Sequence, residues 1–185
     1  MACGSEFAGS AITMENHMNE PEQLLHRRLI RNFNDANDAY QVQRAPLYDS
    51  VGASVTQGTA ALKLGASVDI VAPGQRCCPY HFHHAQEEMF VILEGSGTLR
   101  VADQMLPLRS GDVICIPPGP AYPHQIINTS DAPLKYLSIS TRDSPEVCEY
   151  PDSGKYLATV TDGEQRLFRT LQRSENGLDY WDGEP

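Results

Sequence analysis

The sequence has few of the features that mark nucleic-acid-binding, membrane or secreted proteins. Only 14 of its 185 residues are Lys or Arg, against 24 Asp or Glu, so the formal net charge is −10. Because nucleic acids and anionic membrane surfaces attract basic proteins, this balance argues against both as partners. No apolar run approaches the length of a membrane span, and the N-terminus lacks the basic start and apolar core of a signal peptide. We therefore expect an intracellular chain.

Cysteines are also few and irregularly placed. The five include the adjacent Cys77 and Cys78, and no two form a Cys-x-x-Cys pair. An odd number at irregular spacing is not a disulfide framework, so we expect reduced thiols in a cytoplasmic protein. The sequence also lacks a P-loop, a dinucleotide-binding fingerprint and a nucleophile elbow. Its chemistry must therefore come from another kind of site.

Histidines gather in one short stretch of the chain. His81 and His83 are two residues apart, and on an extended strand such side chains point to the same face. Glu87 and Glu88 follow after a short turn, and the apolar run 89–93 then indicates a buried strand that ends at glycines. Two imidazoles and a carboxylate make up part of a metal-binding shell.

A second stretch supplies the best candidate for a fourth ligand. After the turn at Gly111 and Asp112 comes a short apolar strand, and the proline-rich corner 117–120 then reverses the chain. A second apolar strand begins at His124. Such a reversal can bring His124 back beside the first cluster.

Together the two stretches resemble the paired motifs of the cupin superfamily, over roughly residues 50 to 142. The first motif, a glycine, His-x-His, a glutamate and a glycine, matches Gly74, His81, His83, Glu88 and Gly95. Six residues separate Glu88 from Gly95, which selects Glu88 rather than Glu87. The second motif matches Gly111, Pro117, Gly119, His124 and Asn128. Two loops, before His81 and before His124, are longer than the family pattern.

The chain from about Val42 onward is a series of short apolar segments separated by Gly and Pro turns, which predicts an all-β sandwich or barrel. One predicted hairpin spans residues 98–108, and a further strand spans 134–140. The resemblance makes the expectation specific: a double-stranded β-helix, the jelly-roll cupin barrel, with a metal inside one mouth. We expect a leader or tag remnant at 1–19, an N-terminal extension at 20–49, the barrel at 50–142 and a C-terminal extension at 143–185.

The two extensions carry less specific patterns. Residues 21–31 have apolar side chains at near-helical spacing, although 28–33 fits an edge strand equally well. In the C-terminal extension, Tyr156, Phe168, Tyr180 and Trp181 are expected to pack onto the barrel or a partner subunit, with a lid over the barrel mouth as the alternative. The ends are similar to those of small single-domain bacterial cupins labelled mannose-6-phosphate-isomerase-like. By the same resemblance we expect a homodimer.

The resemblance implies a divalent metal held by His81, His83, Glu88 and His124. These ligand types suit Mn, Fe, Ni, Co, Cu or Zn and do not choose between them. His84 is expected to face away from His83, and Glu87 to lie outside the shell. Such a shell leaves one or two positions open, where a metal polarises a carbonyl or acidifies water.

Tyr80 and Tyr122 flank the expected ligands and are candidates for lining the pocket or donating a proton. We expect apolar pocket walls, which favour a small, partly apolar ligand over a large polyanion. The residues expected to form these walls are Leu62, Phe90, Ile92, Ile114 and Ile126.

Three functions fit this pattern. The first is a metal-dependent enzyme of dioxygenase, isomerase or decarboxylase type that acts on a small carbonyl, hydroxy-acid or aromatic metabolite. The second is a non-catalytic small-molecule binding or sensor protein on the same barrel. The third is a structural or storage barrel without metal.

Overall fold

The structure is a computed structural model that describes residues 18–34, 39–163, 165–173, 175 and 177–185. Nearly all of the expected leader at 1–19 lies outside these residues. The described part contains α1 (Glu20–Leu29), β1 (Ala39–Arg44), β2 (Tyr48–Ser54), β3 (Leu64–Val71), β4 (Phe82–His83), β5 (Glu88–Glu94), β6 (Ser96–Val101), β7 (Gln104–Arg109), β8 (Val113–Ile116), β9 (His124–Ile127), β10 (Leu134–Thr141), β11 (Glu146–Tyr150), the 3-10 turn η2 (Pro151–Ser153), β12 (Lys155–Asp162) and β13 (Gln165–Arg173).

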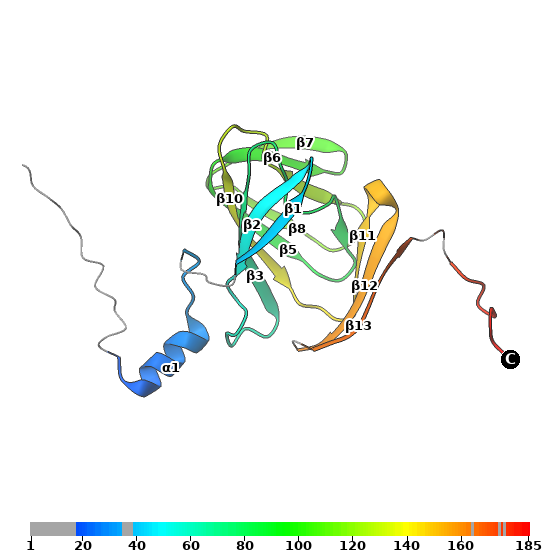
Figure 1. Cartoon of the computed structure of the whole chain (residues 1–185), viewed down its shortest axis with the longest axis horizontal. Helices are drawn as coiled ribbons and strands as arrows, with labels where there is room; N and C mark the ends of the chain where they lie inside the picture. The colour runs from blue at the N-terminus through cyan, green and yellow to red at the C-terminus, as the bar shows by residue number, and fades with distance from the viewer. Residues whose placement is uncertain (1–17, 35–38, 164, 174, 176) are drawn as a thin grey trace, which may run out of the picture.

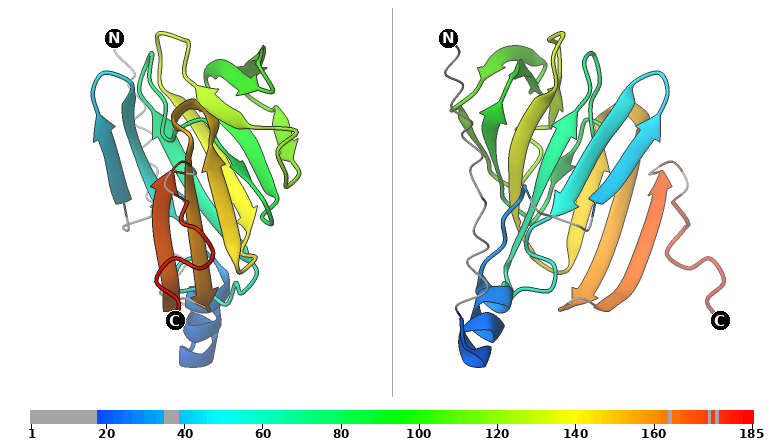
Figure 2. Two further views of the ribbon diagram at one scale, coloured as in Figure 1. Left: turned by 90° about the vertical axis from the view of Figure 1, so that its right-hand side faces the viewer. Right: turned by 60° about the vertical axis from the view of Figure 1, so that its left-hand side comes forward.

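The strands form three antiparallel sheets. The largest has the order β1-β2-β3-β10-β5-β8, a second has β7-β6-β9, and a third has β13-β12-β11-β4. Figures 1 and 2 show the three-stranded sheet facing the large one, with the third sheet beside them on the side away from α1. This arrangement confirms the predicted all-β jelly roll.

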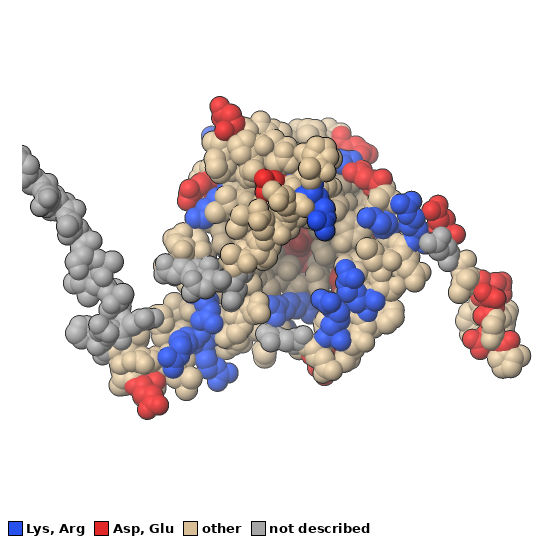
Figure 3. Space-filling view, viewed as in Figure 1, with Lys and Arg blue, Asp and Glu red and all other residues tan. Residues whose placement is uncertain are grey.

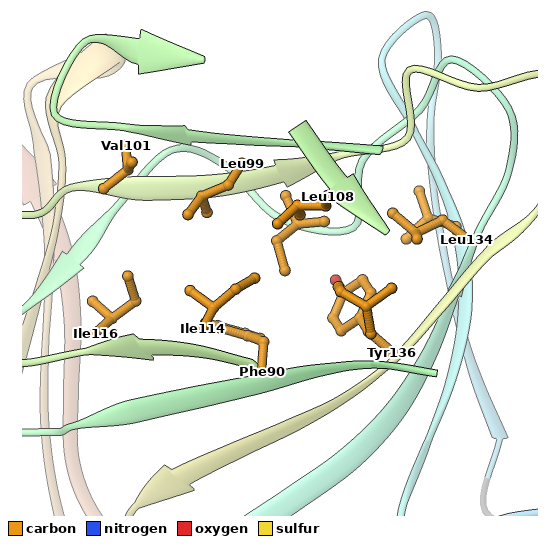
Figure 4. Packing of buried hydrophobic residues seen from close by; sticks show 11 residues of the cluster. Phe90, Leu99, Val101, Leu108, Ile114, Ile116, Leu134 and Tyr136 are labelled. Carbon is orange, nitrogen blue, oxygen red and sulfur yellow. The ribbon is translucent and has the colours of Figure 1, made fainter. Parts of the chain in front are cut away.

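The hydrophobic core lies between the large sheet and the three-stranded sheet. In β5 and β6, for example, every second side chain points inward, and these inward-pointing side chains form the core. Figure 4 shows two layers of these side chains facing each other. The labelled members Phe90, Ile114, Ile116, Leu134 and Tyr136 come from the large sheet, and Leu99, Val101 and Leu108 come from the three-stranded sheet. This packing holds the strand ends that carry the site.

The predicted hairpin is confirmed, and the structure decides between the two alternatives for the N-terminal segment. The hairpin between β6 and β7 turns at Ala102 and Asp103, whose φ angles of 45° and 62° fit the turns that match strand twist. The N-terminal segment is a helix rather than an edge strand, because Asn19 and Glu22 form a reciprocal capping box at its start. No helix in the described ranges is long and apolar enough to cross a membrane.

One expectation about the cavity walls is wrong. Leu62 lies outside the strands, is 86% exposed and does not line the cavity beside the expected ligands. Phe168, Tyr180 and Trp181 are exposed in this single chain, so the expected packing of the C-terminal extension onto the barrel or a partner subunit stays a prediction. Beyond β13, the C-terminal residues leave the sheets, as Figure 1 shows.

Candidate metal centre

His81 and His124 are joined directly by their backbones. The amide of His81 donates to the carbonyl of His124 at 3.1 Å, and the amide of His124 donates back to the carbonyl of His81 at 2.8 Å. His124 is the first residue of β9, directly after the proline-rich corner. The reversal expected from the sequence therefore places the two histidines side by side.

The remaining expected ligands complete one cluster of donor atoms. Glu88 opens β5, and His83 closes the short strand β4. Around Oε2 of Glu88 lie Nε2 of His124 at 2.9 Å, Nε2 of His83 at 3.5 Å and Nε2 of His81 at 3.7 Å. Ligand atoms at such separations can share one ion with bonds of about 2.0–2.2 Å. All four expected ligands thus lie around this oxygen, while the donor atoms within 4.8 Å of one another form two overlapping groups, His81 with Glu88 and His124, and His81 with His83 and Cys148.

Each imidazole is oriented by a partner on its other nitrogen. Nδ1 of His81 lies 2.9 Å from the Pro79 carbonyl, and Nδ1 of His124 lies 3.2 Å from the Tyr122 carbonyl. Because a carbonyl can only accept, Nδ1 carries the proton and Nε2 keeps its lone pair. Those lone pairs point toward the centre of the cluster.

Two atoms at this centre are buried without a hydrogen-bond partner among the described residues: Oε2 of Glu88 and Nε2 of His124. They lie 2.9 Å apart, but the contact does not have the geometry of a hydrogen bond. Leaving a buried polar group unpaired costs about 1–3 kcal/mol. A cation between the two atoms would satisfy both, so the residues present fit a bound metal ion.

Electrostatics also prepare the cluster for a cation. The pKa of His81 is lowered to about 4, mainly by burial and also by the nearby His124. This imidazole is therefore neutral at pH 7. Burial alone would raise the pKa of Glu88, but the contact with His124 and the other imidazoles brings it below its usual range. A neutral imidazole and an ionised carboxylate are the metal-binding forms of these side chains.

Glu146 is a residue of this centre that the sequence did not reveal. It is 5% exposed, and its Oε1 lies 3.2 Å from Nδ1 of His83. Its two oxygens also accept the backbone amides of residues 84, 85 and 86 at 3.1, 3.0 and 2.9 Å. Glu146 reaches this position because β11 pairs with β4, and no local sequence signal announces that pairing. It fixes both the ring of His83 and the loop that follows.

The thiol of Cys148, two residues further along β11, also lies at the centre. The metal-binding atoms of His81, His83 and Cys148 are all within 4.8 Å of one another. Alternate residues of one strand therefore border the cluster, as the two-residue period of a strand requires.

The cluster opens into a cavity of about 250 Å³ inside the barrel. Phe90 and Ile126 line it as expected, whereas Ile92 and Ile114 belong to the core instead. None of the described residues that line it is Lys or Arg. Asp69 lines its wall and was also missed, although an acidic residue inside the apolar segment 68–71 was a signal.

Three other residues named from the sequence, Tyr80, Tyr122 and His84, lie outside the cavity. Tyr80 is buried beneath the guanidinium of Arg100, at 3.7 Å from the ring centre, and Tyr122 is 48% exposed. Neither lines the cavity, so the two tyrosines are not placed for the roles we expected. His84 faces outward and pairs with exposed Glu149 at 2.7 Å.

Two more residues named from the sequence, Glu87 and Asn128, lie outside the donor cluster. Glu87 is exposed, outside the donor cluster. Asn128 is fully buried, and its amide donates to the carbonyls of Val71 at 2.9 Å and Ala132 at 2.8 Å. It therefore ties the end of β9 to β3 and to the following turn.

Comparison with known proteins agrees with this architecture. Residues 67–140 match the family model described as "Cupin domain". A structure from Acidithiobacillus ferrooxidans, named as a proposed sugar phosphate isomerase, superposes with a TM-score of 0.69 at 25% identity, covering 83% of this chain and 97% of that one. Residues 67–140 therefore carry a cupin domain, and the fold and the donor cluster agree with that match.

Two curated relatives are also similar. An uncharacterized protein of Methanocaldococcus jannaschii is 40% identical over 60 residues, which are 32% of this chain and 46% of that protein. Auxin-binding protein 1 of Arabidopsis thaliana is 29% identical over 133 residues, 67% of this chain and 64% of the relative. The chain thus spans between about half and two thirds of the length of these relatives.

Proposed function

We propose that this protein is a metal-dependent cupin enzyme that acts on a small carbonyl, hydroxy-acid or aromatic compound. The observation that carries the proposal is the convergence of three imidazole Nε2 atoms on one oxygen of Glu88, at 2.9, 3.5 and 3.7 Å. Of these residues, His81, Glu88 and His124 line a cavity of about 250 Å³, so a small molecule can reach them.

His81, His83, Glu88 and His124 would hold the ion, with Mn, Fe, Ni, Co, Cu and Zn all suited to this donor set. When bound, such an ion polarises a carbonyl or lowers the pKa of a water molecule. The protein's own contribution is to fix the donors. Backbone carbonyls hold His81 and His124, and Glu146 holds His83, so little reorganisation is needed on binding.

The size and lining of the cavity support a small, unphosphorylated substrate. Its volume lies below the range of about 300–1,000 Å³ typical of sites for drug-sized ligands. Proteins recognise phosphate mainly with Arg, Lys or backbone amides, and the described lining offers no Arg or Lys. The name of the Acidithiobacillus relative therefore does not extend readily to this chain.

A second candidate is a binding protein without turnover. The Arabidopsis relative is named for binding a ligand rather than for a reaction, and it aligns over 133 residues. In that case the cavity would hold a small molecule against the metal and release it unchanged.

One experiment separates these candidates. The purified chain is stripped of metal, reloaded with each of the six ions, and assayed for bound metal, thermal shift and product with a panel of small oxo- and hydroxy-acids. We expect one equivalent of metal, and product formation that is lost in His124→Ala. Stabilisation by a panel member without product supports the binding protein, and failure to bind any of the ions overturns both.

A further inference from the structure

We propose that the cavity has a second polar end, formed by Asp69 with Tyr40 and Ser67, that binds a hydroxyl or ammonium group of the substrate. We call these three residues the Asp69 pole. The inference rests on the proposed metal centre for the other end of the substrate. It narrows the substrate class to small hydroxy- or amino-acids whose carboxylate reaches the metal while the donor group reaches Asp69.

The Asp69 pole is built by a row of cross-strand neighbours. Tyr40 on β1 pairs with Gly52 on β2, Gly52 pairs with Asp69 on β3, and Asp69 pairs with Tyr136 on β10. The side chains of Tyr40, Asp69 and Tyr136 all line the cavity that the metal ligands border. The large sheet thus presents a polar row to the same space as the imidazoles of His81 and His124.

Gly52 is the position that makes this row possible. A Cβ atom there would lie 2.5 Å from Oδ1 of Asp69 and 2.5 Å from the ring carbon and hydroxyl of Tyr40. No side chain tolerates such distances unless the neighbours move. The glycine therefore leaves room for Tyr40 to cross β2 and reach the carboxylate.

The hydrogen bonds of the pole leave only acceptors free. The Tyr40 hydroxyl donates to Oδ1 of Asp69 at 2.7 Å, and the Ser67 hydroxyl donates to Oδ2 at 3.0 Å. Both hydroxyl hydrogens are then used, while an ionised carboxylate has about four acceptor sites in all. The spare lone pairs suit a ligand group that donates hydrogen bonds.

Asp69 also lacks a cationic partner among the described residues. It is 5% exposed, and its contacts are two neutral hydroxyls. Burial raises the pKa of its carboxyl, because the two hydrogen bonds only partly offset the lost hydration. A hydroxyl or an ammonium brought in by a ligand would supply what the carboxylate lacks.

The charge around the opening agrees with such a two-ended ligand. Figure 3 shows acidic atoms inside the hollow on the face that carries β1, with Lys and Arg around its rim. A basic rim attracts a carboxylate, and the donor cluster with its ion would bind it. A phosphate or a second carboxylate would instead meet Asp69 with no cation in the described lining.

Co²⁺-loaded protein and matched unbranched acids test the proposal. Plain, ω-hydroxy and ω-amino carboxylates of three to six carbons are titrated, and the visible spectrum of the bound Co²⁺ reports binding. At one chain length we expect the hydroxy or amino acid to bind about tenfold or more tightly than the plain acid, as a hydrogen bond to a charged group would give. Equal binding of all three series, or no binding of any, overturns the proposal.

The variant Asp69→Asn tests whether the Asp69 pole causes the preference for hydroxy or amino acids over the plain acid. This change keeps the size of the side chain and removes its charge, so we expect the preference to fall to near unity while the plain acid binds as before. Asp131→Asn, at an exposed position, should leave the preference unchanged. Tyr40→Phe keeps Asp69 and frees a lone pair, so it should retain most of the preference.

The Co²⁺ spectrum without any acid separates the two proposals. If Co²⁺ does not bind, the metal centre fails, and the narrower substrate class fails with it. If Co²⁺ binds normally to Asp69→Asn and the preference persists, only the Asp69 pole is wrong.

Discussion

Two buried carboxylates face the same cavity, and their surroundings give them opposite properties. Glu88 has three imidazole nitrogens within 3.7 Å of one oxygen, whereas Asp69 has two hydroxyls. Burial raises both pKa values, but the imidazoles reverse the effect at Glu88 and the hydroxyls do not at Asp69. The partners of a buried carboxylate, rather than its burial, therefore determine whether it is suited to bind a cation or to accept a hydrogen bond from a ligand.

The supports of the two acids differ as well. The Glu88 end is assembled from distant segments, held by the backbone bridge between His81 and His124 and by Glu146 behind His83. Asp69 lies within a regular sheet, and its contact with Tyr40 depends on the absence of a side chain at Gly52. Disturbing the first end should therefore affect metal binding, and disturbing the second should affect stability and ligand preference.

The largest effect is expected at the Glu88 end. His124→Ala removes a proposed ligand that is 1% exposed and leaves Glu88 facing a void. Co²⁺ affinity measured by calorimetry should fall by more than about 100-fold, beyond the loss typical of residues that only orient ligands. Glu87→Gln, one residue away from Glu88 but exposed, is the control and should bind Co²⁺ normally.

Glu146→Gln is expected to weaken Co²⁺ binding by about 10- to 100-fold, as loss of a group behind a ligand typically does. The amide nitrogen of Gln would face backbone amides of residues 84–86, so two donors would meet and the loop would shift. Glu149→Gln is the matched control, because Glu149 contacts only the outward-facing His84 at this loop. Equal Co²⁺ affinities in the two variants would show that Glu146 does not support the metal centre.

At the Asp69 end, Gly52→Ala should destabilise the protein by about 1–3 kcal/mol, as overpacking usually does. The added methyl would push Tyr40 away from Asp69. Gly65→Ala is the control, since its new Cβ would be no closer than 3.3 Å to the side chains of Arg142 and Ser140. Urea unfolding of the metal-free proteins measures both changes, and equal midpoints would contradict the close contact at Gly52.

The smallest effect concerns pH. Because the pKa of Asp69 is raised in the folded protein, the folded state holds this proton more tightly than the unfolded chain. Its contribution to stability is therefore largest below the unfolded pKa of about 3.9 and is lost as pH rises through the folded pKa. Asp69→Asn should gain stability relative to the wild type between about pH 4 and pH 7. A constant difference in unfolding free energy over that range would show that Asp69 has an ordinary pKa.

Much of the fold and of the donor cluster could be predicted. Strand and turn signals gave the hairpin around Ala102, and the motif spacing selected Glu88 over its neighbour. Proximity in sequence failed for Tyr80, because successive residues of an extended chain point to opposite sides, and for Tyr122, because it lies in the exposed corner before β9. Being next to a ligand in the sequence therefore says little about facing the same cavity.

The sequence by itself identified the candidate metal donors, since His81 and His83 share a face through the local geometry of an extended chain, and a short corner returns His124. Only the tertiary structure decided that Glu146 stands behind His83 and that Asp69 faces the cavity. Both depend on strand pairing between segments far apart in the chain. That register is set by the packing of the whole barrel and not by any nearby residue.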